Sequence, residues 1–473
     1  MSAPLVPFAL SLIAGIVIGY YHPVSEHVSL AVLILSFVVS IFLHRLPRLQ
    51  TAALWLTTAI MGMHLVEQQY RTVHTLPQGH DYIVASAPVD KGKTIVMDAL
   101  SSDGKKVRLR MMKGATLHVG NGLTISNNVQ PITYYPLYFD SQGYCGELFA
   151  GYHDWEGKAV SMKGLSVLQR IRLRLLNYRE QLTQRYRDHG LTDDAYSVLA
   201  AMTLGDKSAL TKELRDTYSQ TGASHILALS GLHLGIIYWL ITLMMVSRRW
   251  RTVTMTVTIL AIWAFTFLTG LATSTVRSAI MLTVYSLLQI GYRERASVNV
   301  LAFTAITLLV VHPMAVFDVG FQLSFMAVLS ILLFYPLLYS LLPLPILQEH
   351  RLLKWLWGLS CVSIAAQLGV APLIAFHFHR FSTWFLLSNF IVVPGAYIII
   401  VGAFALLLSG ATWIATLLAT VVTLMNQTLT QMTSWPLASI EGLYPSVIQT
   451  MLIYVAIGAF FISAKVMTKD QIY

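Results

Sequence analysis

Two histidines and two serines interrupt a very apolar stretch, "ASHILALSGLHLGIIYWLI", at residues 223–241. His225 and His233 are eight residues apart, so a helix would place them roughly on one side, about two turns from each other. Polar groups within an apolar span are costly unless they meet partners or water. Ser230 and His233 do not predict a hydrolase, because a nucleophile and base three residues apart on one helix seldom align and no third group is identifiable. We therefore predict no catalytic residue.

A basic and an acidic residue also occur in this apolar half of the chain. Arg277 precedes Arg293 by too few residues for a full span, so it lies within the membrane or on a tilted, broken or re-entrant helix. Asp318 and Gln322 have helical i, i+4 spacing, which puts them on one face. Asp318 is the expected partner of Arg277. This pair could line a polar pocket or pore, or it could be a structural ion pair.

Two amides accompany prolines in apolar segments. Gln367 precedes Pro372 and Asn389 precedes Pro394, and each proline frees backbone carbonyls that protein or water must satisfy. An alternative is that Ser230, Gln367 and Asn389 only bridge neighbouring helices. Because all these groups fall between residues 225 and 394, a shared polar path is the interpretation that unites them.

A different chemistry is expected in residues 67–165, where short β-like runs alternate with turn signals such as "DKGK", "SSDGK" and "HVGNG". This pattern predicts a small antiparallel barrel or sandwich of about five strands. Aromatic residues follow at Tyr134, Tyr135, Tyr138 and Phe139. Basic strands beside aromatic rings are typical of barrels that bind single-stranded nucleic acid, although ordinary solvated hairpins would also carry such charges. The candidate DNA-binding residues are Lys91, Lys93, Lys105, Lys106, Arg108 and Arg110.

The elements that must hold these groups are mostly membrane helices. The 473 residues are 55% hydrophobic and 11% charged, with a mean hydropathy of +0.63. Long uncharged stretches predict a polytopic α-helical membrane protein of about 10–12 spans. The run from Leu5 to Tyr21 is expected to be a retained first span, since it has no basic start or small-residue cleavage site.

Charge in the short loops predicts the orientation. With the N-terminus in the cytoplasm, most loop cations fall on the cytoplasmic side and only Arg380 falls clearly outside, which gives cytoplasmic termini and an external β-domain. The cytoplasmic set is Arg45, Arg48, Arg248, Arg249, Arg251, Arg293, Arg295, Arg351, Lys354, Lys465 and Lys469.

An arginine-rich amphipathic helix is predicted after the β-domain. An apolar stripe with helical spacing is expected to lie flat on the outer leaflet, against membrane lipid; it consists of Leu168, Ile171, Leu175, Tyr178, Leu182 and Tyr186. Two short polar helices should follow at the mouth of the bundle. The expected parts are residues 1–66, N-terminal spans; 67–165, β-domain; 166–223, amphipathic and short helices; and 224–473, transmembrane channel domain.

Several enzyme and metal signatures are missing from the sequence. It has no P-loop and no H-E-x-x-H, and "HFHR" supplies His377 and His379 without a third ligand. We expect no metal, no cofactor and no enzymatic activity.

The blocks "SHILALSGLHLGI", "GLATSTVRSAIMLTVYSLLQIGYRER", "HPMAVFDVGFQLSF" and "APLIAFHFHRFSTWFLLSNFIVVP" resemble, in this order, the competence domain of ComEC-type DNA-internalisation channels, over about residues 192–395. "YFDSQGYCGELFAGYHDW" resembles the exit from that family's OB-like domain. The resemblance implies passage of single-stranded DNA into the cytoplasm through the bacterial inner membrane, with an extracytoplasmic OB-like β-domain. Implied partners are a periplasmic DNA receptor and a cytoplasmic ATP-driven translocase.

One departure from the family concerns a nuclease. Many members carry a metallo-β-lactamase-like domain, but this sequence lacks an H-x-H-x-D-H motif, so it resembles the short members and any nuclease would be a separate protein. Two other classes stay open. A small-solute or ion transporter should show inverted repeats, which are not found, and a membrane scaffold should tolerate polar substitutions in the bundle. The sequence does not predict the oligomeric state.

Overall fold

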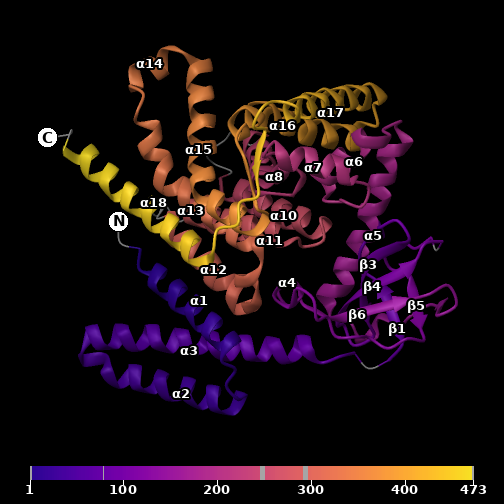
Figure 1. Ribbon diagram of the computed structural model, residues 1–473, viewed down its shortest axis with the longest axis horizontal. Coiled ribbons are helices and arrows are strands. Elements are labelled where there is room, and N and C mark those ends of the chain that lie inside the picture. The colour runs from indigo at the N-terminus through magenta and orange to yellow at the C-terminus, as the bar shows by residue number, and fades with distance from the viewer. Residues whose placement is uncertain (1–2, 78, 115, 245–250, 291–296, 471–473) are drawn as a thin grey trace. The chain divides into compact units, whose positions relative to one another are not determined.

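The computed structural model describes residues 3–77, 79–114, 116–244, 251–290 and 297–470 (Figure 1). The chain divides into two compact units. The first unit contains Met1–Glu180, Met255–Leu271 and Ala279–Phe321, and the second contains Gln181–Thr254, Ala272–Ser278 and Gln322–Tyr473. Arg248, Arg249, Arg293 and Arg295, which contribute to the predicted orientation, lie outside the described residues.

The first unit begins with a helical hairpin and a third helix packed on it. Its helices are α1 (Leu5–Tyr21), α2 (Glu26–Phe42), η1 (Leu43–Arg45), α3 (Pro47–His74), α4 (Pro136–Ser141), η2 (Met162–Gly164), most of α5 (Val167–Asp188), α10 (Arg251–Leu268) and α11 (Thr273–Ile290), then α12 (Ser297–Val311) and η4 (Pro313–Phe317). Helix α1 packs against α3 and α12.

Glycine permits the closest of these contacts. A Cβ atom on Gly15 of α1 would lie 1.8 Å from the Ala59 carbonyl oxygen of α3, and one on Gly62 of α3 would lie 2.6 Å from the Leu12 carbonyl oxygen. Gly15 and Gly19 form a G-x-x-x-G pattern, which lets membrane helices approach backbone to backbone.

The first unit also carries a seven-stranded sheet in the order β6-β4-β3-β1-β5-β7, with β2 beside β3. The strands are β1 (Asp81–Val84), β2 (Val89–Asp90), β3 (Thr94–Ser101), β4 (Lys106–Met112), β5 (Gly122–Ile125), β6 (Tyr144–Ala150) and β7 (Trp155–Gly157). The prediction of about five antiparallel strands is therefore wrong in two respects. There are more strands, and β6 pairs with β4 in parallel, because the connection through α4 returns the chain to enter the sheet in the direction of β4.

Side chains alternate across β4 as strand geometry requires. Val107, Leu109 and Met111 point into a core shared with Met97 and Leu123, so the remaining β4 side chains point outward.

Helix α5 packs differently from the prediction. Leu173 and Leu176 are buried in a second core with Ile83, Leu100 and Val119 of the β-domain, so in the first half of α5 the buried face is not the predicted stripe. Of that stripe, Leu168 is 61% exposed and Ile171 40% exposed. The first half of the predicted stripe thus lies beside the docked face, whereas Leu182 and Tyr186 at its end are buried in the protein. Contact of the exposed part with lipid stays a prediction.

The second unit is helical apart from a small two-stranded sheet of β8 (Arg380–Ser382) and β9 (Ser439–Glu441). Its helices are α6 (Asp193–Leu204), α7 (Lys212–Gln220), α8 (Ser224–Leu227), α9 (Gly231–Met244), α13 (Val319–Tyr339), α14 (Leu344–Glu349), α15 (Arg351–Phe378), α16 (Phe385–Ser409), α17 (Thr412–Thr433) and α18 (Val447–Asp470). Helices α6 and α7 pack on α17, where the Tyr218 hydroxyl donates to Asn426 Oδ1 at 2.7 Å.

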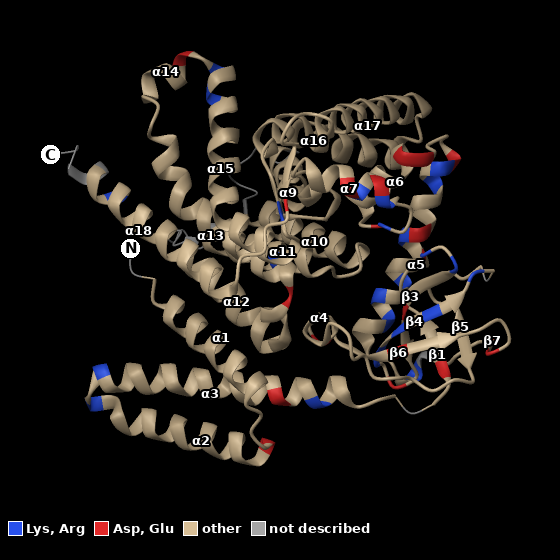
Figure 2. Ribbon diagram, viewed as in Figure 1, with Lys and Arg blue, Asp and Glu red and all other residues tan. Residues whose placement is uncertain are grey.

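Seven described helices are long and apolar enough to cross a membrane, and four shorter apolar helices accompany them. Lysine, arginine, aspartate and glutamate are sparse along these helices (Figure 2). The chain is thus a polytopic α-helical membrane protein with a β-domain, whereas the count of 10–12 spans stays a prediction.

Candidate functional site

The outward face of β4 gathers three of the predicted DNA-binding residues. Lys106, Arg108 and Arg110 alternate with the buried residues of this strand, and Figure 2 shows basic residues on the ribbon there. Lys106 Nζ lies 3.2 Å from an Asp98 carboxylate oxygen. Glu147 of β6 lies 3.8 Å from Arg108 Nε and 3.3 Å from Arg110 Nη2. Each of these two carboxylates therefore stands beside cations on the outer face of β4.

Aromatic rings surround the same cations. Lys106 Nζ lies 3.9 Å from the centre of the Tyr144 ring, and the Arg108 guanidinium lies 5.1 Å from that of Phe139. Arg108 Nη1 also donates to the Tyr134 hydroxyl at 3.1 Å. The predicted association of basic strand and aromatic segment is thus present as direct contacts.

Arg172 of α5 lies beside this surface, because the next residue, Leu173, shares a core with Leu100, and Leu100 of β3 pairs with Lys106. Burial lowers the pKa of the Lys106 ammonium, attraction to Asp98 opposes that change, and repulsion by Arg172 adds to it. Burial also lowers the pKa of Arg172, while Asp98 and Tyr144 oppose the change. The only available sequence signal was the position of Arg172 beside Leu173, a residue of the docked face.

The other predicted lysines do not belong to one site. Lys91 and Lys93 are exposed in the β2–β3 turn, next to the end of β4 where Thr94 pairs with Met112. Lys105 lies at the opposite end of β4, where it contacts Asp103 at 3.2 Å and donates to the Leu76 carbonyl at 3.3 Å. The six candidates are therefore spread along a strand rather than gathered around one point.

Within the first unit, a hydrogen-bond network joins α4 of the β-domain to membrane helices. His312 Nε2 pairs with the Ser141 carbonyl at 2.9 Å, and its Nδ1 pairs with Gln69 of α3. Gln142 Nε2 donates to Asp318 Oδ2. Asp318 Oδ1 in turn accepts the Phe321 amide hydrogen at 2.7 Å, as a helix-capping carboxylate does. Asp318 thus ties the start of α13 to the β-domain.

The proposed pairing of Asp318 with Arg277 stays a prediction, because the two residues belong to different compact units. Arg277 lies on α11 and is buried.

The serine and histidine of the apolar stretch interact locally. His233 Nδ1 accepts a hydrogen bond from the Ser230 amide at 3.1 Å and lies 3.0 Å from Ser230 Oγ. This assignment places the ring proton on Nε2, which is buried and has no hydrogen-bond partner among the described residues. His225 instead pairs with the Gly222 carbonyl at 3.1 Å.

The remaining polar candidates mostly bridge helices of the second unit. Gln322 Oε1 pairs with His377 Nε2 at 2.9 Å, and Asn389 Nδ2 donates to Ser363 Oγ at 3.0 Å. Gln367 is partly buried on α15, whose Pro372 lies inside a continuous helix. The Tyr454 hydroxyl donates to the Gly369 carbonyl at 2.7 Å, next to this proline. Of the three residues in the alternative interpretation, Asn389 has such a bridge between helices, and the roles of Ser230 and Gln367 stay predictions.

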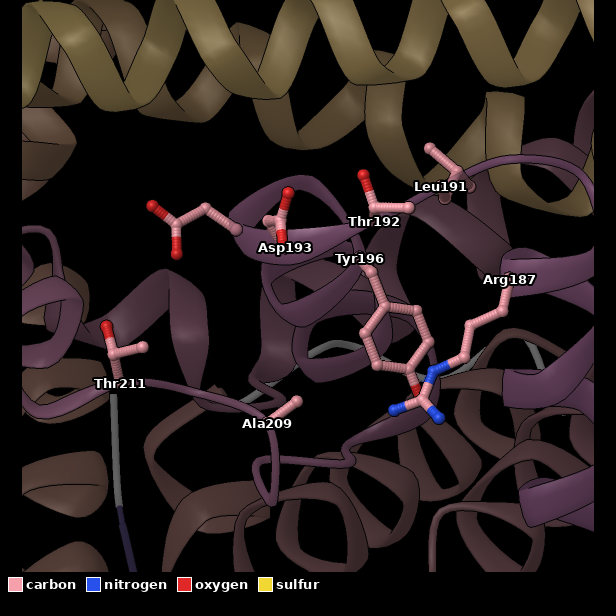
Figure 3. Close-up of a pocket in the computed structure, with 8 residues that line it drawn as sticks. Arg187, Leu191, Thr192, Asp193, Tyr196, Ala209 and Thr211 are labelled. Atoms are coloured by element: carbon pink, nitrogen blue, oxygen red, sulfur yellow. The ribbon is translucent and has the colours of Figure 1, made fainter.

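A pocket of about 510 Å³ lies in the second unit between the end of α5 and the start of α6 (Figure 3). The Arg187 guanidinium lies 4.4 Å from the centre of the Tyr196 ring, and Asp193 and Thr192 line the opposite part. Both charge signs are present, so the pocket has no clear preference for an anion or a cation. In the part of the chain that the structure describes, no group of three metal-binding side chains occurs.

Fold and surface together define a multi-pass helical membrane protein with a basic, aromatic-lined β-domain. The Competence protein family matches residues 202–466, more than half of the chain, and the chain belongs to this family.

Curated relatives agree with this membership. ComE operon protein 3 of Bacillus subtilis (strain 168) is 27% identical over 310 residues, covering 64% of this chain and 37% of the relative. Recombination protein 2 of Haemophilus influenzae (strain ATCC 51907 / DSM 11121 / KW20 / Rd) is 26% identical, covering 42% of this chain and 26% of the relative. An uncharacterized protein of Aquifex aeolicus (strain VF5) is 30% identical over 200 residues, covering 42% of this chain and 45% of the relative. The chain thus spans less than half the length of each of these proteins, and no solved structure matches it.

Proposed function

We propose that this protein carries single-stranded DNA across the bacterial cytoplasmic membrane during natural transformation. Membership of the Competence protein family supports a role in DNA uptake. The observation that carries the proposal is the outer face of β4, where Lys106 and Arg108 lie against the rings of Tyr144 and Phe139. Cations for phosphates beside rings for bases are what a single-strand-binding surface needs.

The β-domain acts in this proposal as an external OB-like receiver of the strand. Its sheet supports this interpretation. An OB fold is a partly open Greek-key barrel, in which neighbouring strands are not all consecutive in the chain, and here β1 lies between β3 and β5 while β6 lies beside β4. The DNA would then enter a bundle formed by the transmembrane channel domain, residues 224–473, past the short helices of residues 166–223.

The polar residues of the apolar half of the chain are proposed contacts along that path. They are His225, Ser230, His233, Arg277, Asp318, Gln322, Gln367 and Asn389. The proposed orientation has both termini in the cytoplasm. The proposed partners are a periplasmic DNA receptor that delivers the strand and a cytoplasmic ATP-driven translocase that supplies the driving force. Any nuclease would be a separate protein.

The test is uptake of labelled transforming DNA in a deletion strain complemented with the wild-type gene. We expect DNA to remain outside the cytoplasm in the deletion strain and to enter on complementation. Entry at the normal rate without the protein would overturn the proposal and favour a solute transporter or a scaffold.

A further inference from the structure

The outer surface around β4 and the start of α5 has more positive charge than its neighbours neutralise. The carboxylates of Asp98 and Glu147 form ion pairs with cations of this surface. Lys106, Arg108 and Arg110 contact them. Arg172 adds a fourth cation, since its neighbour Leu173 shares a core with Leu100, which pairs with Lys106. Such a surplus attracts an anion whose charge completes the balance.

The carboxylate of Asp98 is already engaged on more than one side. It lies 3.2 Å from Lys106 Nζ and accepts the Tyr144 hydroxyl hydrogen at 2.6 Å. Arg172 Nε is a buried donor with no hydrogen-bond partner among the described residues. A buried N–H group without an acceptor is costly, so a ligand oxygen at this point would restore a lost interaction.

An exposed ring stands next to the cations. Tyr138 of α4 is 52% exposed and holds an edge contact with Phe139, with their centres 5.1 Å apart. Helix α4, which carries this ring, packs on β6 and on η4, the short helix that precedes α13.

We propose that Lys106 and Arg172 bind one phosphodiester group of a DNA strand while the ring of Tyr138 stacks on an adjacent base. This inference rests on the proposed function and adds the ligand groups that this surface recognises. A phosphodiester offers two unbridged oxygens and one negative charge, which suit a guanidinium fork beside a lysine point charge. A phospholipid headgroup has the same phosphate chemistry, but it gives no role to the exposed ring.

The proposal is tested on the full-length protein in detergent, by fluorescence anisotropy of a labelled oligothymidylate at increasing sodium chloride. Arg172→Gln is compared with Arg174→Gln, which removes the same charge from an exposed position on the same helix. We expect Arg172→Gln to flatten the slope of log affinity against log salt by about 0.7, the value for one lost phosphate contact on a single strand. Arg174→Gln should leave the slope nearly unchanged, and Arg172→Lys should retain most of it.

The ring is tested in the same assay. Tyr138→Ala should weaken binding by roughly five- to hundredfold, the range for a lost base–aromatic stack, whereas Tyr138→Phe should bind normally. Tyr152→Ala is the matched control, since this tyrosine of the same domain is 63% exposed. Elution of every variant as a single folded species by size exclusion separates loss of binding from loss of structure.

Several outcomes would overturn the inference. Equal slopes for Arg172→Gln and Arg174→Gln would mean that only the overall field attracts DNA. Unchanged oligonucleotide binding together with loss of co-purified anionic phospholipid, seen by native mass spectrometry, would assign the site to lipid. If the wild-type protein binds no oligonucleotide, the proposed receiving surface fails as well; if wild type and variants bind equally, only this site fails.

Discussion

The outer face of β4 and the membrane helices of the second unit satisfy their polar groups in different ways. On β4, Glu147 stands beside two arginines and an N–H of Arg172 has no acceptor. In the second unit, polar side chains bridge neighbouring helices, as Gln322 does with His377 and Asn389 with Ser363. A carboxylate that several cations share leaves those cations available to a ligand. A polar side chain in a membrane helix that bonds to another helix needs no ligand.

Polar residues therefore indicate different things in the two regions. A polar residue in a membrane helix is weak evidence of a path when its partner is another helix. The atoms left over in the second unit are more informative, and among the described residues they include Nε2 of His233 and Oδ1 of Asn389. A wet path through this unit should touch these two atoms.

The largest effect is expected at Asp318, where pairing can be separated from charge. Asp318→Ala removes both the cap on the Phe321 amide and the acceptor for Gln142, which should destabilise the protein by about 2 kcal/mol. Asp318→Asn keeps the capping oxygen, and Gln142 can turn its amide to match, so its loss should be small. Thermal unfolding of the purified variants measures both changes.

The same pair of variants tests the role of Asp318 in transport. Failure of Asp318→Asn to support DNA uptake at normal abundance would show that the negative charge itself is needed. That result would mean that Asp318 acts through its charge and not only through its hydrogen bonds, which would favour its predicted role as the partner of Arg277.

The second largest effect is expected at Glu147 of the β4 surface. Glu147→Gln should increase affinity for single-stranded DNA by roughly three- to tenfold, because it removes the charge that Arg108 and Arg110 share. Glutamine still offers an oxygen to the Tyr134 hydroxyl, which donates to Glu147 at 2.8 Å. Anisotropy titrations of the full-length protein measure the change.

Glu156→Gln is the control for this gain. Glu156 is an exposed acid on β7 of the same domain, and its neutralisation should change affinity much less. An equal gain in affinity in both variants would mean that Glu147 does not compete with DNA for Arg108 and Arg110.

The sequence predicted the basic strand because alternation needs only neighbouring residues. Lys106, Arg108 and Arg110 were predicted as DNA-binding candidates on a basic strand, and the structure places all three on the outward face of that strand. Arg172 could not be added in the same way. Whether Arg172 or Arg174 faces β4 depends on which side of α5 docks on the β-domain. Apolar residues occur both on the docked side, with Leu173 and Leu176, and on the exposed side, with Leu168 and Ile171.

Pairing across distant segments was equally hidden. The spacing of Asp318 and Gln322 suggested one shared face, yet Asp318 bonds to Gln142 and Gln322 to His377. No sequence period links such positions, since the fold of the whole chain brings them together. The apolar composition still predicted the helical membrane architecture, because span length depends on a local run of residues.

A smaller effect is expected for the Asn389–Ser363 bridge. A double-mutant cycle with Asn389→Ala and Ser363→Ala should give a coupling of about 0.6 kcal/mol, the typical size of such bonds between membrane helices. Thermal unfolding in lipid nanodiscs measures the cycle, and DNA uptake by the two single variants separates the bridge from a contact with DNA. Uptake that is lost in Asn389→Ala but intact in Ser363→Ala would mean that the leftover Asn389 oxygen contacts the cargo, which would break the comparison for this residue.

The smallest effect is a pH dependence that only the β4 surface should show. Because burial lowers the pKa of Lys106, its charge is lost as pH rises through a value below that of an ordinary lysine. Affinity for DNA should fall by roughly two- to threefold over that rise, since one phosphate contact loses its cation. Stability should change in the opposite direction, because the folded protein binds the Lys106 proton more weakly than the unfolded chain does, so deprotonation favours the folded state. Lys106→Arg keeps its charge throughout and should abolish both trends, whereas the same fall in affinity in this variant would assign the titration to another group.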